Sequence, residues 1–358
     1  MGIIAGLLGL PDGDRKFGQT VGQRVVFEAA QEYVRAIEEE AAQFRSFFVQ
    51  ERTSEFKRRY KLPGGGFLQE RSQQTEAAAV KPYGEWDVAF PLWDRGSQLA
   101  WTDIEFAYMT PNSLDNYLET IRVQYMNTLR RDILSAMFDS TARTFLDKQH
   151  GSLSIQPLAN GDSVVYPPVL GSSAEATESH YIETNYATAS MSDTNNPYKA
   201  AREELEEHFG MPTGFGNIVA LINNAELSKS QALTDWFDVE DMGVRYGNDS
   251  DLALLGPMSP GRRVGRVSGV WASVYPWIPA TYMVFVDADQ PKPLIERVDP
   301  ADTGITPGLN LVSESDRYPM QMSHYRARYG FGAGNRLNGV VLELNTGGSY
   351  TVPAAYDL

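Results

Sequence analysis

The stretch TPNSLDNYLETIRVQYMNTLRRDILSAM, residues 110–137, carries the strongest helix signal of the chain. Thr110 is a suitable N-cap, and Pro111 suits the first helical position. Apolar residues then recur three or four positions apart, at Leu114, Tyr117, Leu118, Ile121, Tyr125, Leu129, Ile133, Ala136 and Met137. This pattern predicts a helix over residues 111–148, roughly 55 Å long at 1.5 Å per residue. A helix of that length with one apolar stripe is typical of a spine on which other elements lie.

Upstream of the spine helix, the sequence predicts another helix and then a long ribbon. Helical spacing runs from Thr20 to Gln50, after a segment rich in Gly that is typical of a flexible arm. Residues 52–102 predict two long strands in an extended hairpin, interrupted by the turn sequences 63–66 and 81–84. A two-stranded ribbon is marginally stable alone, so we expect it to lie on another surface.

Downstream, the pattern changes to alternating helices and strands. NPYKAAREELEEHF, residues 196–209, predicts a short acidic helix, and NIVALINNAEL, residues 217–227, predicts a buried strand followed by a helix. Strand signals resume within residues 266–289. We therefore predict an inserted α/β module over residues 213–310, after which the last strands, HYRARYGFG and VVLEL, rejoin the region of the spine helix.

The Gly-rich stretch RYGFGAGNRLNGVVLEL, residues 328–344, resembles a dinucleotide-binding loop only superficially. Asn335 stands where the third Gly of G-x-G-x-x-G belongs, and a predicted strand follows instead of a helix. Asn338-Gly339 is a tight-hairpin signal before that strand. We therefore interpret the glycines as positions where the backbone turns sharply or packs closely.

The composition is that of a globular protein and excludes several classes of site. The chain has 358 residues, enough for two domains or one elaborated domain. It has no Cys, which excludes disulfides, zinc–thiolate sites, iron–sulfur clusters and Cys nucleophiles. The formal net charge of −15 predicts weak non-specific contact with DNA, which is held through Lys and Arg. No run of about 18 apolar residues occurs, so we predict no membrane partner.

No arrangement of residues predicts catalysis. The four His are not paired at helical spacing and no HExxH motif is present. The acidic cluster DWFDVED, residues 235–241, could suggest a glycosidase with a sugar-stacking Trp, but sequence adjacency does not place two carboxylates across a cleft. A solvated loop is the simpler interpretation. We predict no catalytic residue, no cofactor and no metal site.

The basic run of residues 57–61 favours a contact between subunits. DNA binding and a solvated strand face are alternatives, but a basic ribbon on an acidic neighbouring subunit gains from charge complementarity. Arg262 and Arg263, which we expect in a loop, could act similarly. An arm and a ribbon would be exposed liabilities on a monomer, whereas interlocking subunits would cover them. The candidate inter-subunit contacts are Phe17, Arg58, Arg59, Lys61, Phe67, Trp93, Arg262 and Arg263.

The order of these parts resembles the major capsid proteins of tailed double-stranded DNA phages, which have the Hong Kong 97-like fold. The resemblance spans nearly the whole chain and rests on DVAFPLWDRGSQLAW, DNYLETIRVQYMNTLRRDIL, NIVALINNAEL, IPATYMVFVDADQPKPLIERVDP and RYGFGAGNRLNGVVLEL. It implies an α+β fold whose parts are an N-arm (1–52), an E-loop (53–102), a P-domain (103–212 and 311–358, with the spine helix at 111–148) and an A-domain (213–310).

The resemblance also implies a function and partners. Such proteins self-assemble into pentamers and hexamers that form an icosahedral head shell around phage DNA. The expected partners are other copies of the chain, a portal protein, separate scaffold or decoration proteins, and packaged DNA through weak contacts. The expected location is the virion, after assembly in the host cytoplasm. Some members crosslink an E-loop Lys to an Asn, for which Lys57 or Lys61 and Asn335 or Asn338 are candidates.

Two alternatives remain open from the sequence. One is an encapsulin-type nanocompartment shell, which has the same fold and encloses protein cargo. The other belongs to a different class, an acidic glycan-binding protein or hydrolase that uses some of the 6 Trp and 18 Tyr.

Overall fold

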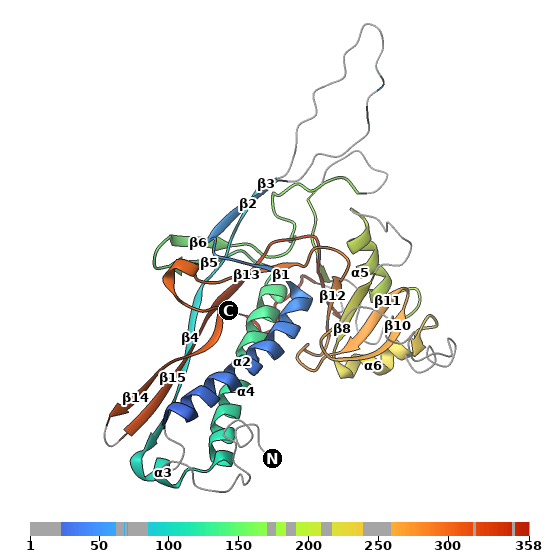
Figure 1. Cartoon of the computed structure of the whole chain (residues 1–358). Coiled ribbons are helices and arrows are strands. Elements are labelled where there is room, and N and C mark those ends of the chain that lie inside the picture. The colour runs from blue at the N-terminus through green and yellow to red at the C-terminus, as the bar shows by residue number, and fades with distance from the viewer. Residues whose placement is uncertain are drawn as a thin grey trace.

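The computed structural model has an elongated α+β fold with two main sheets (Figure 1). It describes residues 23–61, 68, 70, 85–169, 177–183, 191–208, 217–238, 259–317, 320–345 and 348–357. The helices are α2 (Gln23–Phe48), α3 (Asp103–Tyr108), α4 (Pro111–Phe138), α5 (Pro197–Glu206), α6 (Asn224–Gln231) and the 3-10 turn η2 (Ala301–Thr303). The paired strands β2 (Lys57–Lys61) and β3 (Glu85–Ala89), called the ribbon base here, lie at one end of the molecule, and α3 lies at the other. The second sheet lies to one side with α5 and α6.

The first sheet has five strands in the order β1-β13-β15-β14, with β4 also paired to β15. Its members are β1 (Val49–Thr53), β4 (Trp93–Thr102), β13 (Leu294–Arg297), β14 (Gly308–Arg317) and β15 (Met320–Ala333). The pairing β1–β13 is parallel, and those of β15 with β13, β14 and β4 are antiparallel. This sheet therefore joins segments from near both ends of the chain.

The second sheet has seven strands in the order β7-β16-β12-β8-β11-β10-β9. Its members are β7 (Tyr181–Glu183), β8 (Ile218–Ile222), β9 (Phe237–Asp238), β10 (Arg262–Val267), β11 (Val270–Val274), β12 (Tyr282–Asp287) and β16 (Val340–Glu343). The central strands β8, β11 and β12 are wholly buried, as expected for strands covered on both faces. Two small ribbons complete the fold, β2 (Lys57–Lys61) with β3 (Glu85–Ala89), and β5 (Arg143–Asp147) with β6 (Gly151–Ile155).

Helix α4 is the predicted spine helix, although it is shorter than predicted. The Thr110 side chain accepts a hydrogen bond from the Ser113 backbone N–H, as its N-cap position requires. The helix ends at Phe138 instead of at Lys148, so its 28 residues span about 42 Å. Asp139 is extended, and Arg143–Asp147 leave the helical path to pair with Gly151–Ile155 as a hairpin. Thr144 and Phe145 suit a pleated strand, and the apolar stripe that predicted the helix stops before them.

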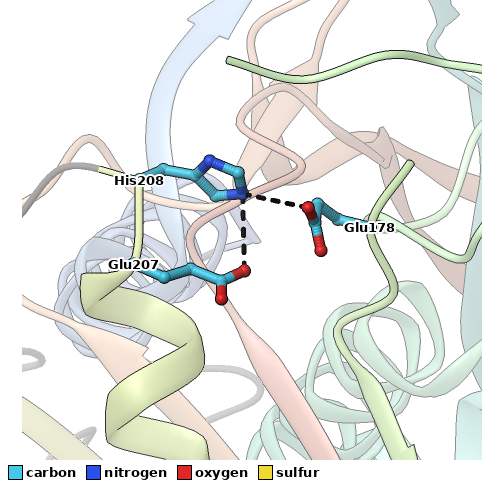
Figure 2. Close-up of side chains that lie close together, drawn as sticks. All are labelled: Glu178, Glu207 and His208. Carbon is cyan, nitrogen blue, oxygen red and sulfur yellow. Dashed lines mark ion pairs between the residues drawn. The ribbon is translucent and has the colours of Figure 1, made fainter. Parts of the chain in front are cut away.

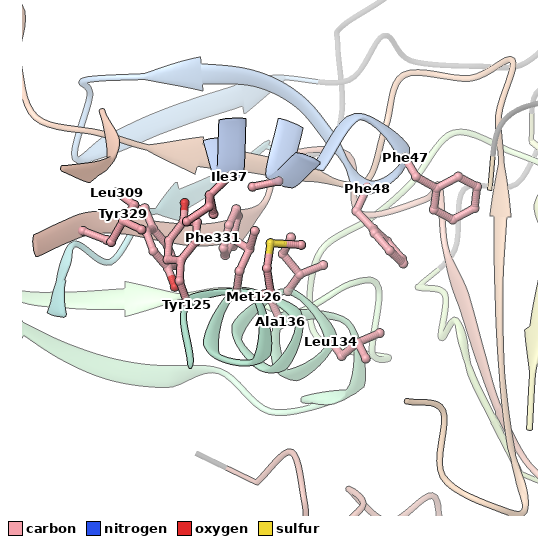
Figure 3. Packing of buried hydrophobic residues seen from close by; sticks show 14 of the residues in the cluster. Ile37, Phe47, Phe48, Tyr125, Met126, Leu134, Ala136, Leu309, Tyr329 and Phe331 are labelled. Atoms are coloured by element: carbon pink, nitrogen blue, oxygen red, sulfur yellow. The ribbon is translucent and has the colours of Figure 1, made fainter. Parts of the chain in front are cut away.

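The main core lies where α2 and α4 pack on the first sheet (Figure 3). Leu129 and Ile133 of α4 and Phe48 of α2 have no exposed surface, and Phe331 of β15 is nearly as buried. The helix predicted over residues 20–50 is confirmed as α2, which spans Gln23–Phe48. Its apolar stripe and that of α4 are therefore covered by the sheet and by each other.

An ion cluster, defined here as Glu38, Arg45, Tyr125 and Glu296, ties α2 to α4 and to the first sheet. The Arg45 guanidinium lies 2.6 Å from the Glu38 carboxylate and 3.7 Å from that of Glu296, and donates to the Tyr125 hydroxyl at 3.1 Å. The side chains of Arg45 and Glu296 are 5% and 1% exposed. Glu38 also accepts from Tyr125 and from the backbone N–H of Leu309. Buried charges of this kind are stable only while each keeps its partner.

The predicted ribbon over residues 52–102 is a hairpin only at its described base. Strands β2 and β3 pair from Lys57↔Ala89 to Lys61↔Glu85, but the following strand β4 pairs with β15. Pro91 lies between β3 and β4 and cannot donate to a ladder, which suits it to the point where the chain changes sheets. The prediction that residues 93–102 extend the ribbon was therefore wrong. Residues 62–67, 69 and 71–84 lie outside the described residues.

The second sheet includes strands from outside the predicted α/β module of residues 213–310. The strand at 218–222, the helix after it and the helix at 197–206 are confirmed as β8, α6 and α5. However, β7 and β16 belong to the same sheet and come from outside residues 213–310. We expected the VVLEL strand to rejoin the region of the spine helix. Its strand β16 pairs with β12 and β7, and its Val341 lies in the same core cluster as Met137 of α4.

The glycines of the Gly-rich stretch allow close packing, as the sequence indicated. Gly330 and Gly332 lie within β15, where a Cβ on Gly330 would come 2.1 Å from the Pro91 carbonyl oxygen. Asn338 does not form a tight hairpin, because β15 and β16 are not paired. Its buried side chain instead accepts from the Asp287 N–H and donates to the Asp287 and Pro291 carbonyls.

Gly330→Ala is expected to lower the free energy of unfolding by about 1–3 kcal/mol, because the added methyl must displace backbone and not a flexible side chain. Urea unfolding followed by tryptophan fluorescence measures the loss. Gly96→Ala is the matched control, since its Cβ would meet the Tyr325 carbonyl at a more tolerable 3.2 Å. Equal stability of the two variants would contradict the packing role of Gly330.

Candidate functional site

The basic strand β2 lies at the base of the ribbon, with Lys57, Arg59 and Lys61 exposed on one face. Exposed and partly buried side chains alternate along β2, because successive side chains of a strand point to opposite sides. On the other face, Tyr60 stacks on Trp86 with ring centroids 5.5 Å apart. Trp86 is buried against Tyr166 and thereby fastens the ribbon to the body of the molecule.

Acidic residues of the same chain accompany each of the four basic side chains. Lys57 and Arg59 contact the Asp87 carboxylate at 2.6 and 2.8 Å, and Lys61 lies 3.9 Å from Glu85. Arg58 pairs with Glu51 and, at 2.7 Å, with Glu55. The sequence suggested a free basic strand that attracts an acidic neighbour. The structure instead shows a strand whose charge is largely balanced within its own subunit.

Acidification is expected to loosen the base of the ribbon. Hydrogen bonds from Arg59 and Lys57 hold the pKa of Asp87 well below its usual value. Its ion pairs therefore stabilise the fold fully above the unfolded pKa of about 3.9, and this contribution is lost as the pH falls toward the folded pKa. Because the pairs are solvent-exposed, amide exchange in β2 and β3, relative to β15, should rise only about two- to fivefold.

Hydrogen exchange with mass spectrometry, corrected for intrinsic rates, measures this effect. Asp87→Asn should show the faster exchange already at neutral pH and no further step on acidification. An acid-induced step of the same size in wild type and Asp87→Asn would contradict the role of Asp87.

Trp93, Arg262 and Arg263 are only partly available to a neighbour. Trp93 packs edge-on against Phe145 with centroids 4.8 Å apart. Arg262 is exposed, whereas the Arg263 guanidinium lies 5.6 Å from the centre of the Trp271 ring. Both arginines begin strand β10 and do not lie in a loop as expected. Phe17 and Phe67 lie outside the described residues.

The structure shows an exposed apolar tip that the sequence analysis missed, defined here as Ile104 and Tyr108 of α3. The two side chains are 73% and 63% exposed and lie one turn apart on a helix with no buried residue. Thr102 and Glu105 form a capping box that fixes where α3 begins. The i, i+4 spacing of Ile104 and Tyr108 was the signal available in the sequence, but it falls between the predicted ribbon, which ends at residue 102, and the predicted spine helix, which begins at residue 111.

The residues considered for catalysis are dispersed. His180 is fully buried, its Nδ1 lies 3.0 Å from the Gly339 carbonyl oxygen, and burial lowers its pKa to about 4. His150 stacks on Phe56 with centroids 3.9 Å apart. His208 lies beside Glu178 and Glu207, the one group of described residues that could hold a metal ion.

The remaining candidate features fit structural roles. Trp236 packs against β10, where a Cβ on Gly265 would come 2.3 Å from its ring. It is therefore not a freely presented sugar-stacking Trp; residues 239–241 of that acidic cluster lie outside the described residues. Asn338 is buried, which removes it as a crosslinking partner in this conformation. No helix among the described residues is long and apolar enough to cross a membrane.

Comparison with solved structures identifies the fold. A chain from Mycobacterium phage Patience superposes with a TM-score of 0.68 at 17% identity, over 94% of this chain and 92% of that one. A chain of the cyanophage Pam1 capsid gives 0.51 at 11% identity, over 84% and 91%. A chain of the bacteriophage PhiM1 mature capsid gives 0.50 at 10% identity, over 84% and 86%. No protein-family model and no curated protein matches the sequence.

These similarities lie in the fold and not in the sequence, since all three identities are low. The chain thus has a fold found in phage capsids, and the likeness to the two capsid chains spans 84% of it. The expected α+β fold of phage capsid chains is confirmed, whereas its division into N-arm, E-loop, P-domain and A-domain stays a prediction.

Proposed function

We propose that this chain is the major capsid protein of a tailed phage, which self-assembles into the head shell around double-stranded DNA. The observation that carries the proposal is the fold shared with phage chains over 94% of the sequence for the first comparison. The exposed apolar tip and the ribbon base lie at opposite ends of the molecule and also support the proposal. Neighbouring copies that cover them would remove exposed apolar surface from water.

In this proposal each part of the chain has an assembly role. Residues 1–52 are the N-arm and 53–102 the E-loop. In this division α2 and β4 stay in the core and the first sheet of their own subunit, and the parts before α2 and beyond β2 and β3 reach across neighbouring subunits. Residues 103–212 and 311–358 form the P-domain, with the tip of α3 at its end. Residues 213–310 form the A-domain, which meets its copies at the centres of pentamers and hexamers.

The proposed role is structural and not enzymatic. Two side chains considered for catalysis have structural contacts instead: Trp236 packs against Gly265, and His180 lies in hydrogen-bond contact with the Gly339 carbonyl. The net charge of −15 limits adhesion to packaged DNA, since such adhesion needs neutralising Lys and Arg. The portal, scaffold or decoration partners and the virion location belong to the same proposal.

Expression of the chain alone, followed by light scattering and negative-stain electron microscopy, tests the proposal. Closed shells, or rings of five and six subunits, are the expected result. A monodisperse monomer at all protein concentrations would contradict self-assembly of the chain. Shells that contain a copurified protein and no nucleic acid would indicate an encapsulin-type nanocompartment instead.

A further inference from the structure

Three potential metal ligands converge from two separate segments at the end of α5 (Figure 2). Glu207 and His208 follow the last turn of α5, and Glu178 lies in the segment 177–180 that leads into β7. The His208 Nε2 atom lies 3.9 Å from the Glu178 carboxylate and 3.5 Å from that of Glu207. Ligand atoms of all three residues fall within 4.8 Å of one another.

Backbone contacts hold the segment of Glu178 in place, and burial holds the His208 side chain. Glu178 accepts a hydrogen bond through its carbonyl from the Gly161 N–H at 2.7 Å, and Ser179 forms a bridge with Asn160. The His208 side chain is 2% exposed, and its ring lies 6.4 Å from that of the buried Tyr166. The imidazole is therefore held inside the molecule, with Nε2 directed at both carboxylates.

The spacing matches what a tetrahedral metal requires. Two ligand atoms about 2.1 Å from a zinc ion lie about 3.4 Å apart. The observed 3.5 and 3.9 Å need only small side-chain movements to reach this value. The Glu178 and Glu207 side chains are 17% and 27% exposed, so both carboxylates are partly accessible from solvent.

The electrostatics of the cluster favour a cation. Among the described residues, neither Glu178 nor Glu207 forms an ion pair with Lys or Arg.

We propose that Glu178, Glu207 and His208 form a site for a divalent transition-metal ion, with Zn²⁺ the best match, that links the end of α5 to the segment 177–180. One imidazole with two carboxylates is a ligand set that Zn²⁺ accepts, with water at the fourth position. Mg²⁺ and Ca²⁺ prefer ligand sets made of oxygen, and Ca²⁺ takes six to eight of them. The site is independent of the proposed shell function.

Zinc binding to the full-length chain tests the site. The chain is stripped with a chelator, dialysed against Zn²⁺ in the presence of excess Mg²⁺, and its metal content is measured by mass spectrometry. We expect one zinc per chain, and at least about tenfold weaker binding in Glu207→Gln and in His208→Ala. Glu203→Gln, an exposed residue one turn earlier on α5, and His150→Ala are the matched controls and should bind like the wild type.

X-ray absorption at the zinc edge supplies a second measurement on the wild type alone, so that a variant that fails to fold does not decide the question. Nitrogen and oxygen ligands at about 2.0–2.1 Å are expected. Absent stoichiometric zinc, displacement by Mg²⁺, or equal zinc content in the ligand variants and the controls would each overturn the proposal.

Discussion

Arg45→Met is expected to lower the free energy of unfolding by about 3–5 kcal/mol, because it leaves the buried Glu296 carboxylate and the half-buried Glu38 carboxylate without their shared partner. Met fills much of the volume of the Arg stem, so the loss comes from uncompensated charge and not from a cavity. Arg52 still reaches Glu296 at 2.9 Å, but it is 41% exposed and cannot replace the buried contact. A loss of this size would be a large part of the stability of a typical domain.

Urea unfolding of the unassembled chain, followed by circular dichroism, measures this loss. Arg35→Met on the same helix is the matched control, since Arg35 pairs with Glu32 and is 69% exposed. It should change stability by no more than about 0.5 kcal/mol. Similar midpoints for the two variants would show that the ion cluster does not hold α2 in place.

Ile104→Asp combined with Tyr108→Asp is expected to prevent assembly while leaving the subunit folded. The two side chains are exposed in the subunit, so their loss should hardly change its stability. In an interface they would be buried, and two carboxylates there would be costly to desolvate. We expect the protein concentration needed for shell formation to rise at least about tenfold.

Light scattering across a concentration series measures that threshold. Thr120→Asp, which adds a carboxylate on an exposed position of α4, is the control and should assemble normally. Assembly of the double variant at the wild-type threshold would show that the apolar tip of α3 is not a subunit contact. Failure of the control as well would trace the effect to added negative charge in general.

The elements with a strong local signal could be predicted from the sequence. Thr110 and Pro111 fix the start of α4, and the unbroken apolar run of residues 218–222 identifies a central strand. The end of α4 was overestimated, because the apolar stripe that predicted it stops at Met137 and the residues up to Lys148 carried no helical signal of their own. The sequence pattern also cannot say which strand pairs with which. The pairing of β4 with β15 joins segments more than 200 residues apart, which no local pattern specifies.

The candidate contacts were harder to predict than the fold. The sequence shows the charge of a basic run such as residues 57–61 but not its ion-pair partners. Asp87 is such a partner only because β3 pairs with β2 in the folded chain. The same holds for Glu178 and His208, which lie far apart along the chain. The tip of α3 was missed because exposure is a property of the folded molecule.

The parallel pairing of β1 with β13 has a consequence for the way the protein is made. Val49 pairs with Leu294, so β1 must wait for about 245 further residues before its neighbour leaves the ribosome, about 10–50 s at ordinary rates of translation. During that time the apolar stripe of α2 has no sheet to cover it. Topologies with such distant pairings fold slowly, through intermediates whose exposed apolar surface makes them prone to aggregate. The nascent chain is therefore a natural client for a chaperone, and the yield of soluble subunit should depend on chaperone supply more than on the stability of the finished fold.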